Sequence, residues 1–139
     1  TYNSHPMCLV AADATLKVLE EEDLMSRARE LETVLIKGLT ELKGRHPSLA
    51  SFRCRGLLAM MDLGRDGKGT PIAPFNGTHP LMERFKSLLL ERGIYTAIRW
   101  SHVMITPPLV ISEEEIATAL AAFDEALKIT DEMHPSHST

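Results

Sequence analysis

Residues 93–112, GIYTAIRWSHVMITPPLVIS, decide the fold, because they hold two short apolar runs and a proline pair. The runs 94–99 and 103–106 are separated only by residues 100–102, a spacing that predicts a β-hairpin. The prolines at 107–108 end the second strand, since proline has no N–H to donate to a central β-ladder. The segment therefore predicts two antiparallel strands that end in an irregular connection.

A helix is expected directly after this connection, running to about Glu132. Ser112 and Glu115, three residues apart, form the sequence signature of a capping box. Apolar side chains then recur at helical spacing, at Ile116, Leu120, Phe123 and Leu127. The acidic run 113–115 is explained by the positive end of the helix dipole and needs no catalytic role.

The residues before the hairpin predict three more helices and another strand pair. Apolar positions at helical spacing indicate helices over about 6–22, 24–44 and 81–92, with the acidic run 20–23 between the first two. Residues 51–55 and 57–63 are short runs, and the second alternates as a strand does; Gly56 between them marks either a turn between two strands or a bulge in one. Residues 64–80 are rich in glycine and proline, which predicts a long polar loop. The order α-α-β-β-α-β-β-α indicates an α+β fold: a small, mostly antiparallel sheet with helices on one face.

Composition excludes several classes of protein. The chain has 139 residues, a formal net charge of −4 and two cysteines, and no apolar run near the length of a membrane span. The acidic balance argues against a nucleic-acid or anionic-membrane partner, and two cysteines are too few for a disulfide scaffold. Their scarcity favours a reducing, cytoplasmic setting. Because no initiator methionine or signal core precedes Thr1, we expect a piece of a longer protein.

Most candidate chemical sites have a structural explanation. His134 and His137 could hold a metal, but a polar tail without a third ligand makes solvated histidines the better interpretation. Cys8 and Cys54 lie on apolar faces and are expected to be small core side chains, and His5 is not placed to activate Cys8. Residues 64–69, GRDGKG, lack the Lys-Ser/Thr pair of a phosphate-binding loop. We therefore predict no metal site.

Arg99 is the candidate that stands apart. It ends an apolar strand beside the only tryptophan, Trp100. A guanidinium at a strand tip can bind a carboxylate, sulfonate or phosphate through two parallel hydrogen bonds. The alternative is an exposed arginine that packs on Trp100 through a cation–π contact.

Three segments, in order, resemble class III aminotransferases, which are pyridoxal-phosphate enzymes of fold type I. Residues 1–6, TYNSHP, are similar to the family's Thr-Tyr-Ser-Gly-His-Pro segment, with Asn3-Ser4 in place of Ser-Gly. Residues 53–58, RCRGLL, resemble its Arg-Gly-x-Gly-Leu strand region. Residues 93–99 and 105–112 resemble its C-terminal strand, proline pair and final helix, with a shorter turn after Arg99 than in many members. The nearest branch uses taurine or ω-amino acids with pyruvate.

The resemblance implies a single domain over 1–139, the C-terminal small domain of a dimeric aminotransferase. Residues 1–22 would be the helix entering from the large domain, 23–132 the small α+β domain, and 133–139 a loose tail. By the same resemblance Thr1 binds the cofactor phosphate of the partner subunit and Arg99 binds the acid group of the substrate. The lysine that holds the cofactor lies upstream in the family, so no catalytic residue is expected in this chain, which would be inactive alone. The alternative is a non-catalytic module that binds a small acid or serves dimerisation.

Overall fold

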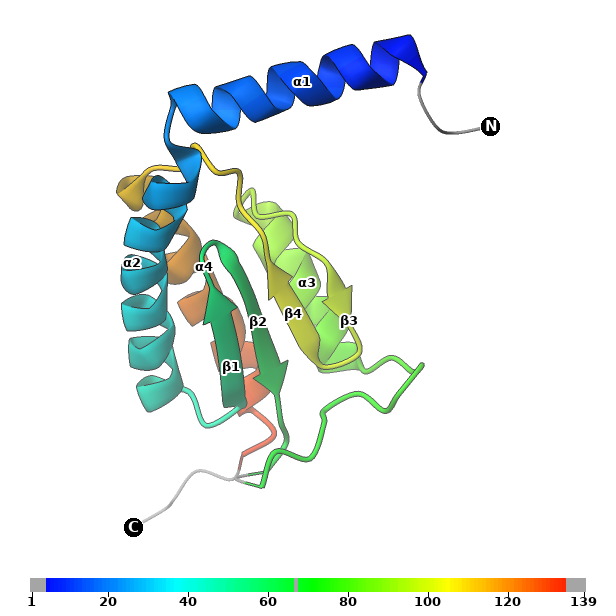
Figure 1. The fold of residues 1–139 in the computed structure, drawn as a ribbon. Helices are drawn as coiled ribbons and strands as arrows, with labels where there is room; N and C mark the ends of the chain where they lie inside the picture. Colours follow the sequence, from blue (N-terminus) through cyan, green and yellow to red (C-terminus); the bar gives the residue numbers. More distant parts are fainter. Residues whose placement is uncertain (1–4, 67, 135–139) are drawn as a thin grey trace.

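The computed structural model describes residues 5–66 and 68–134 and has the predicted order of helices and strands (Figure 1). Each helix begins close to where its sequence signals place it. The α4 capping box is present, with Ser112 Oγ accepting from the Glu115 N–H at 3.1 Å. None of the described helices has the length and apolar composition of a membrane span. The elements are α1 Pro6–Glu21, α2 Leu24–Arg45, β1 Leu49–Arg55, β2 Leu58–Leu63, α3 Pro80–Glu91, β3 Ile98–Arg99, β4 His102–Ile105 and α4 Glu113–Asp131.

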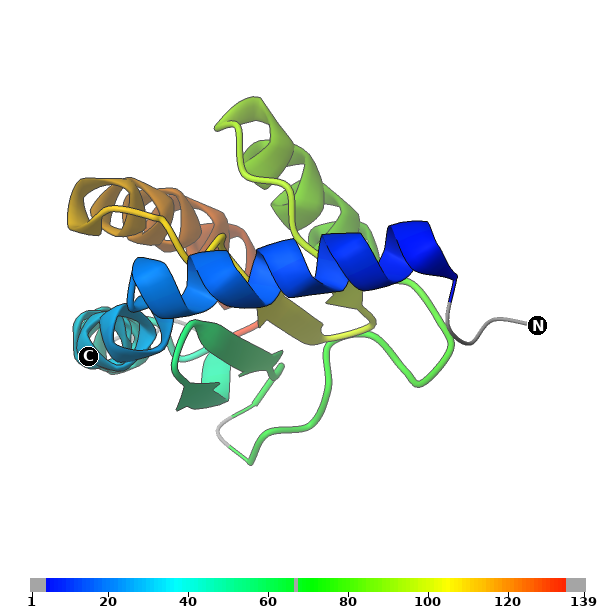
Figure 2. The same cartoon turned by 45° about the horizontal axis from the view of Figure 1, so that its top comes forward.

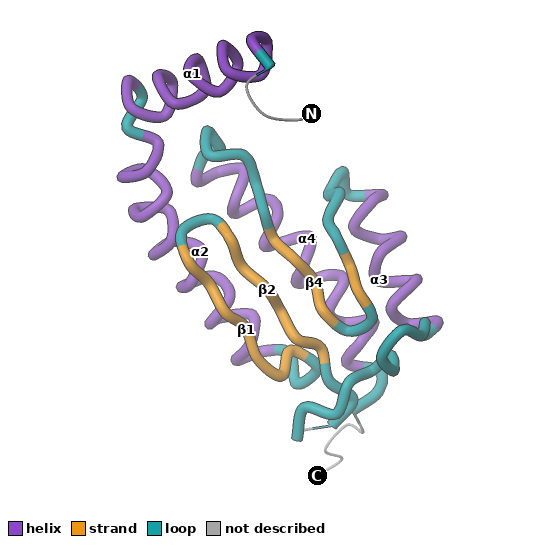
Figure 3. Tube along the Cα trace, turned by 45° about the vertical axis from the view of Figure 1, so that its right-hand side comes forward, coloured by secondary structure: helices purple, strands orange, loops and turns teal. Residues whose placement is uncertain are grey.

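The strands form one antiparallel sheet in the order β1-β2-β4-β3, which confirms the α+β prediction. Helices α2, α3 and α4 cover one face of the sheet, and Figure 3 shows the other face without a helix. Alternate strand residues supply the core, as in a half-buried sheet. The central buried side chains come from every layer and include Leu39, Leu42, Met61, Phe85, Val103 and Leu127.

The glycine after β1 belongs to a turn. Gly56 has φ +57° and joins two separate strands, so the strand pair is the correct one of the two alternatives. A register irregularity does occur in β1, but between Leu49 and Ser51. A left-handed φ favours glycine, which explains the residue at this point of the turn.

The second hairpin is shorter than predicted. Only Ile98 and Arg99 form β3, not 94–99, and the turn occupies residues 100–101 because His102 is already in β4. Upstream of β3, the Ala97 carbonyl still accepts from the Met104 N–H at 2.9 Å, and the Thr96 hydroxyl donates to the Met104 carbonyl. A side chain thus replaces the regular ladder at residue 96, and this ends the strand early.

Helix α1 departs most from the expected packing. It lies across one end of the domain in Figure 1, and Figure 2 looks onto it from above. No residue of α1 is buried, and Leu9, Val10 and Leu16 are 57%, 68% and 60% exposed. The expectation that Cys8 is a core side chain is wrong, because it is exposed on this helix, whereas Cys54 is half-buried. Burial, and secondarily the charge of Glu32, raise the pKa of the Cys54 thiol, so it is no activated nucleophile.

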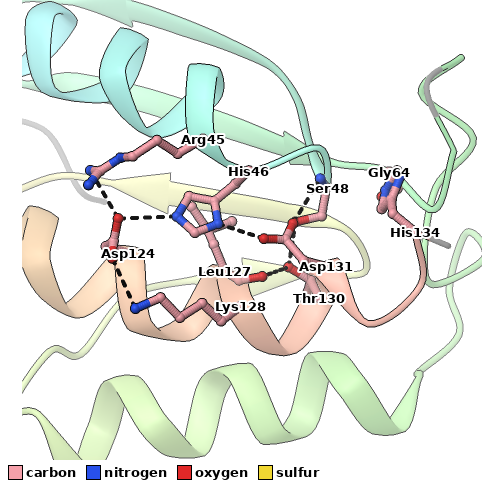
Figure 4. A network of polar contacts seen from close by, with 10 residues as sticks. All are labelled: Arg45, His46, Ser48, Gly64, Asp124, Leu127, Lys128, Thr130, Asp131 and His134. Atoms are coloured by element: carbon pink, nitrogen blue, oxygen red, sulfur yellow. Dashed lines mark hydrogen bonds and ion pairs between the residues drawn. The ribbon is translucent and has the colours of Figure 1, made fainter. Parts of the chain in front are cut away.

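A buried polar network joins the ends of α2 and α4 (Figure 4). His46, 4% exposed, follows α2; its Nδ1 lies 2.6 Å from an Asp131 oxygen and its Nε2 lies 3.2 Å from an Asp124 oxygen. The His46 ring thus lies between two carboxylates of α4 and links the end of α2 to that helix. Asp131 also accepts from the Ser48 N–H at 3.0 Å and the Ser48 hydroxyl at 2.6 Å. We call His46, Ser48, Asp124 and Asp131 the helix-end clamp.

We expect the helix-end clamp to contribute less to the stability of the fold in acid. The hydrogen bond from His46, helped by Lys128 and the charge of Arg45, outweighs burial and lowers the pKa of Asp124. A carboxyl whose folded pKa lies below its unfolded pKa stabilises the fold above the unfolded value of about 4, and this contribution is lost as the pH falls through the folded pKa. Urea unfolding at pH 7 and pH 3 should therefore show a smaller acid-induced loss in Asp124→Asn than in the unmodified chain. The exposed Asp13→Asn variant is the control and should retain the full loss; equal losses in all three proteins would contradict the assignment.

Candidate functional site

Arg99 is exposed at the end of β3, the edge strand of the sheet. Within the described residues its guanidinium forms no hydrogen bond or ion pair with the protein. It lies beside a shallow groove of about 240 Å³ whose lining includes Asn76, Thr78, Glu83 and Lys86. The position leaves the guanidinium available for an acid group, the chemistry predicted for it.

Trp100 does not hold Arg99. Its ring stacks on Phe75, with centroids 4.3 Å apart and the planes tilted by 44°, and meets the His102 ring edge-on at 6.3 Å. No cation–π contact of Arg99 occurs in the part of the chain that the structure describes. Trp100 has φ +54°, a left-handed conformation that is costly for a large side chain. The strained turn fixes Arg99 and the Phe75–Trp100 pair at the same tip of the sheet.

The long loop 64–80 is anchored against this turn. Ile72 and Ala73 are buried, and the Ser101 hydroxyl accepts from the Ala73 N–H at 2.8 Å. The Asp66 carboxylate accepts from the backbone N–H groups of Lys68 and Thr70 at 3.0 and 2.9 Å. The loop also supplies Asn76 and Thr78 to the wall of the groove beside Arg99.

The other sequence candidates lie at the two ends of the chain. Thr1, the expected cofactor-phosphate residue, lies outside the described residues, as does His137. His134 forms a hydrogen bond with the Gly64 carbonyl at 3.0 Å, so this part of the predicted loose tail is fixed. Over residues 5–66 and 68–134 no group of acidic, histidine or cysteine side chains could hold a metal.

A second polar cluster, on the helix-free face, was missed by sequence reasoning. Asp62 on β2 accepts from the Ser51 hydroxyl at 2.6 Å, from the Arg53 guanidinium at 3.1 Å and from His102 Nδ1 at 2.7 Å. Burial would raise the pKa of Asp62, but the hydrogen bonds from Ser51 and His102 and the charge of Arg53 lower it overall. The available signal is the alternation of polar residues opposite the apolar positions of β1 and β2.

Pyridoxal phosphate, the cofactor of class III aminotransferases, needs a lysine to hold it in a water-poor site. All six lysines of this chain are exposed, on helices or in the loop: Lys17, Lys37, Lys43, Lys68, Lys86 and Lys128. The described residues therefore do not fit the cofactor by themselves.

Comparison with known proteins gives the family. The class III aminotransferase family model matches residues 1–127. Ornithine aminotransferase 1 of Staphylococcus aureus (strain Mu50) is 33% identical over 129 residues, which are 92% of this chain and 28% of that protein. This chain thus spans about a quarter of the length of the curated relatives it matches.

Solved structures agree. The taurine:2-oxoglutarate aminotransferase of Bifidobacterium kashiwanohense, in complex with PLP and glutamate, superposes with a TM-score of 0.82 at 25% identity, covering 88% of this chain and 28% of that one. The adenosylmethionine-8-amino-7-oxononanoate aminotransferase of Methanocaldococcus jannaschii gives 0.78 at 28% identity, covering 92% and 30%. The match runs over nearly the whole chain in both sequence and fold, so the chain belongs to the class III aminotransferases.

Proposed function

We propose that this chain is the C-terminal small domain of a pyridoxal-phosphate aminotransferase that moves an amino group from taurine or an ω-amino acid to pyruvate or another 2-oxo acid. The observation that carries the proposal is the family match over residues 1–127, together with the exposed guanidinium of Arg99 at the tip of the sheet, which has no partner among the described residues. The proposed enzyme is a cytoplasmic homodimer. Residues 1–22 form its entering helix, 23–132 the small domain and 133–139 a tail.

Within this enzyme Arg99 binds the acid group of the amino donor or acceptor. Its planar guanidinium offers paired N–H donors that match a carboxylate or sulfonate, so it selects by charge geometry. Thr1 contributes a hydroxyl and a backbone N–H to the cofactor phosphate of the partner subunit, both suitable donors. Pyridoxal phosphate, when bound by residues outside this chain, supplies the electron sink for amino transfer.

The exposed apolar residues of α1 support the entering-helix assignment. Met7, Leu9, Val10 and Leu16 would otherwise face water along a helix that contacts α2 and buries none of its own residues. Such a surface is typical of an interface with another part of the protein. The large domain of the same enzyme is the partner that the family assignment provides.

Spectroscopy of the longer gene product tests the proposal. Lysine-bound pyridoxal phosphate absorbs visible light, and we expect this band to bleach on addition of taurine or β-alanine and to return with pyruvate. The 139-residue chain alone should show neither the band nor transamination. If the longer protein has no such band, the alternative function is favoured: a non-catalytic α+β module that binds a small acid or serves dimerisation.

Removing the guanidinium tests Arg99 in the same longer protein. Arg99→Ala should lower kcat/KM for taurine and β-alanine by about 10- to 100-fold, the loss of one charge-assisted bidentate contact. Amines without an acid group should be affected much less. Arg84→Ala, whose exposed arginine pairs with Glu132 on the helix side, is the matched control. An equal loss for acidic and neutral donors would refute the role of Arg99 in substrate binding.

A further inference from the structure

The helix-free face of the sheet carries a polar row that crosses all four strands. Ser51 pairs with Asp62, Asp62 with His102, and His102 with Arg99 in the strand register. Residues directly opposite each other in antiparallel strands point to the same side of the sheet. Arg53 lies beside this row, two residues from Ser51 on β1. No helix covers this face in Figure 3.

Asp62 fixes the orientation of His102. Since the Asp62 carboxylate accepts from His102 Nδ1 at 2.7 Å, that nitrogen carries the hydrogen and Nε2 is directed away from Asp62. The carboxylate is held in turn by the Ser51 hydroxyl at 2.6 Å and by Arg53 Nη2 at 3.1 and 3.3 Å. A carboxylate that accepts from one ring nitrogen fixes the tautomer and leaves the other nitrogen free to accept a hydrogen bond.

His102 and Arg53 line an open groove of about 570 Å³, whose other walls include Lys68 and Gly69. The groove is lined by two cations, Arg53 and Lys68, by one carboxylate, Asp62, and by the His102 ring. Arg53 donates to Asp62 through Nη2 alone. Within the described residues, its other guanidinium nitrogens form no hydrogen bond with the protein and can donate to a ligand. The chain as a whole has a net charge of −4, so this local excess of positive charge is a particular property of the groove.

We propose that this groove binds the hydrogen phosphate group of a small anion: the Arg53 guanidinium donates to its oxygens, His102 Nε2 accepts from its hydroxyl, and Asp62 is a positioning residue. Lys68 adds charge at the rim. Because the groups around the ligand can carry more than one positive charge, a dianion is bound more tightly than a monoanion. The site is separate from the groove beside Arg99 and does not depend on the proposed aminotransferase activity.

Titration of the 139-residue protein with inorganic phosphate tests the site. At fixed pH and ionic strength, NMR of the histidine rings should show a saturable shift of His102, with backbone shifts at Ser51 and Asp62. His79, which caps α3, reports on nonspecific effects and should not move. Acetate, a monoanion without a hydroxyl hydrogen, should bind more weakly; binding as tight as that of phosphate would overturn the proposed preference for a dianion.

Matched variants distinguish specific binding in this groove from nonspecific electrostatic attraction to the chain. Arg53→Gln and, separately, His102→Gln should each weaken phosphate binding about tenfold, the loss of one charge-assisted hydrogen bond. Arg84→Gln changes the chain charge equally at a site on the helix side and should bind as the unmodified protein does. Unchanged backbone spectra would show that the variants remain folded. A linear, non-saturating shift of His102, or equal affinity in Arg53→Gln and Arg84→Gln, would overturn the proposal.

Discussion

Asp131→Asn is expected to lower the free energy of unfolding by about 2–3 kcal/mol, because it removes a charge that three buried donors face. The carboxylate accepts from His46 Nδ1 at 2.6 Å, from the Ser48 hydroxyl at 2.6 Å and from the Ser48 N–H at 3.0 Å. An amide cannot accept from all of them, and its NH₂ group would face donors. His46 would keep Asp124 as its one remaining carboxylate partner.

Urea denaturation at pH 7 measures this loss. The matched control is Asp13→Asn, which removes a carboxylate whose partner Lys17 is 65% exposed. An exposed i,i+4 pair contributes about 0.3–0.5 kcal/mol, so the control should change little. If Asp131→Asn were as mild as Asp13→Asn, the helix-end clamp would be an exposed ion pair in solution and not a buried link between α2 and α4.

The contacts of the helix-end clamp could not be predicted from the sequence. His46 and Asp131 are 85 residues apart, and His46 and Asp124 are 78 apart. Nothing in the local pattern of either segment indicates these contacts, because they arise only when α4 packs beside α2. Periodicity predicts which face of each helix is buried, but not which polar residues meet at the ends.

Helix α1 and strand β3 are likewise predicted from the sequence only in part. The apolar spacing of α1 correctly predicts a helix, yet its apolar residues are exposed, because amphipathicity indicates a face to be covered and not what covers it. Residues 94–99 form an apolar run that predicts a strand, but an edge strand has a neighbour on one side only, and the Thr96 hydroxyl takes over one ladder position. The sequence correctly places Arg99 at a strand tip, and its substrate role stays a prediction.

Phe85→Ala should lower the free energy of unfolding by about 3–5 kcal/mol, which is more than Asp124→Asn or Asp131→Asn should lower it. Phe85 lies on α3, is 0% exposed, and belongs to the same buried cluster as Val103 of β4 and Leu127 of α4. The interior is close-packed, so removing the ring loses its contacts and leaves a cavity that the neighbouring helices and strands can fill only in part. For a chain of this size the melting temperature should fall by about 10–15 °C.

Two phenylalanine controls separate loss of packing from loss of a ring as such. Phe75→Ala removes an equal ring that is 82% exposed and touches mainly Trp100, so its cost should be that of one aromatic pair, about 0.5–1.5 kcal/mol. Phe85→Leu keeps most of the buried volume and should cost less than about 1.5 kcal/mol. Thermal unfolding of the three variants should rank Phe85→Ala well below the other two. If Phe85→Ala were no less stable than Phe75→Ala, α3 would not be packed in the core in solution. The groove beside Arg99, which α3 helps to line, would then lose its support.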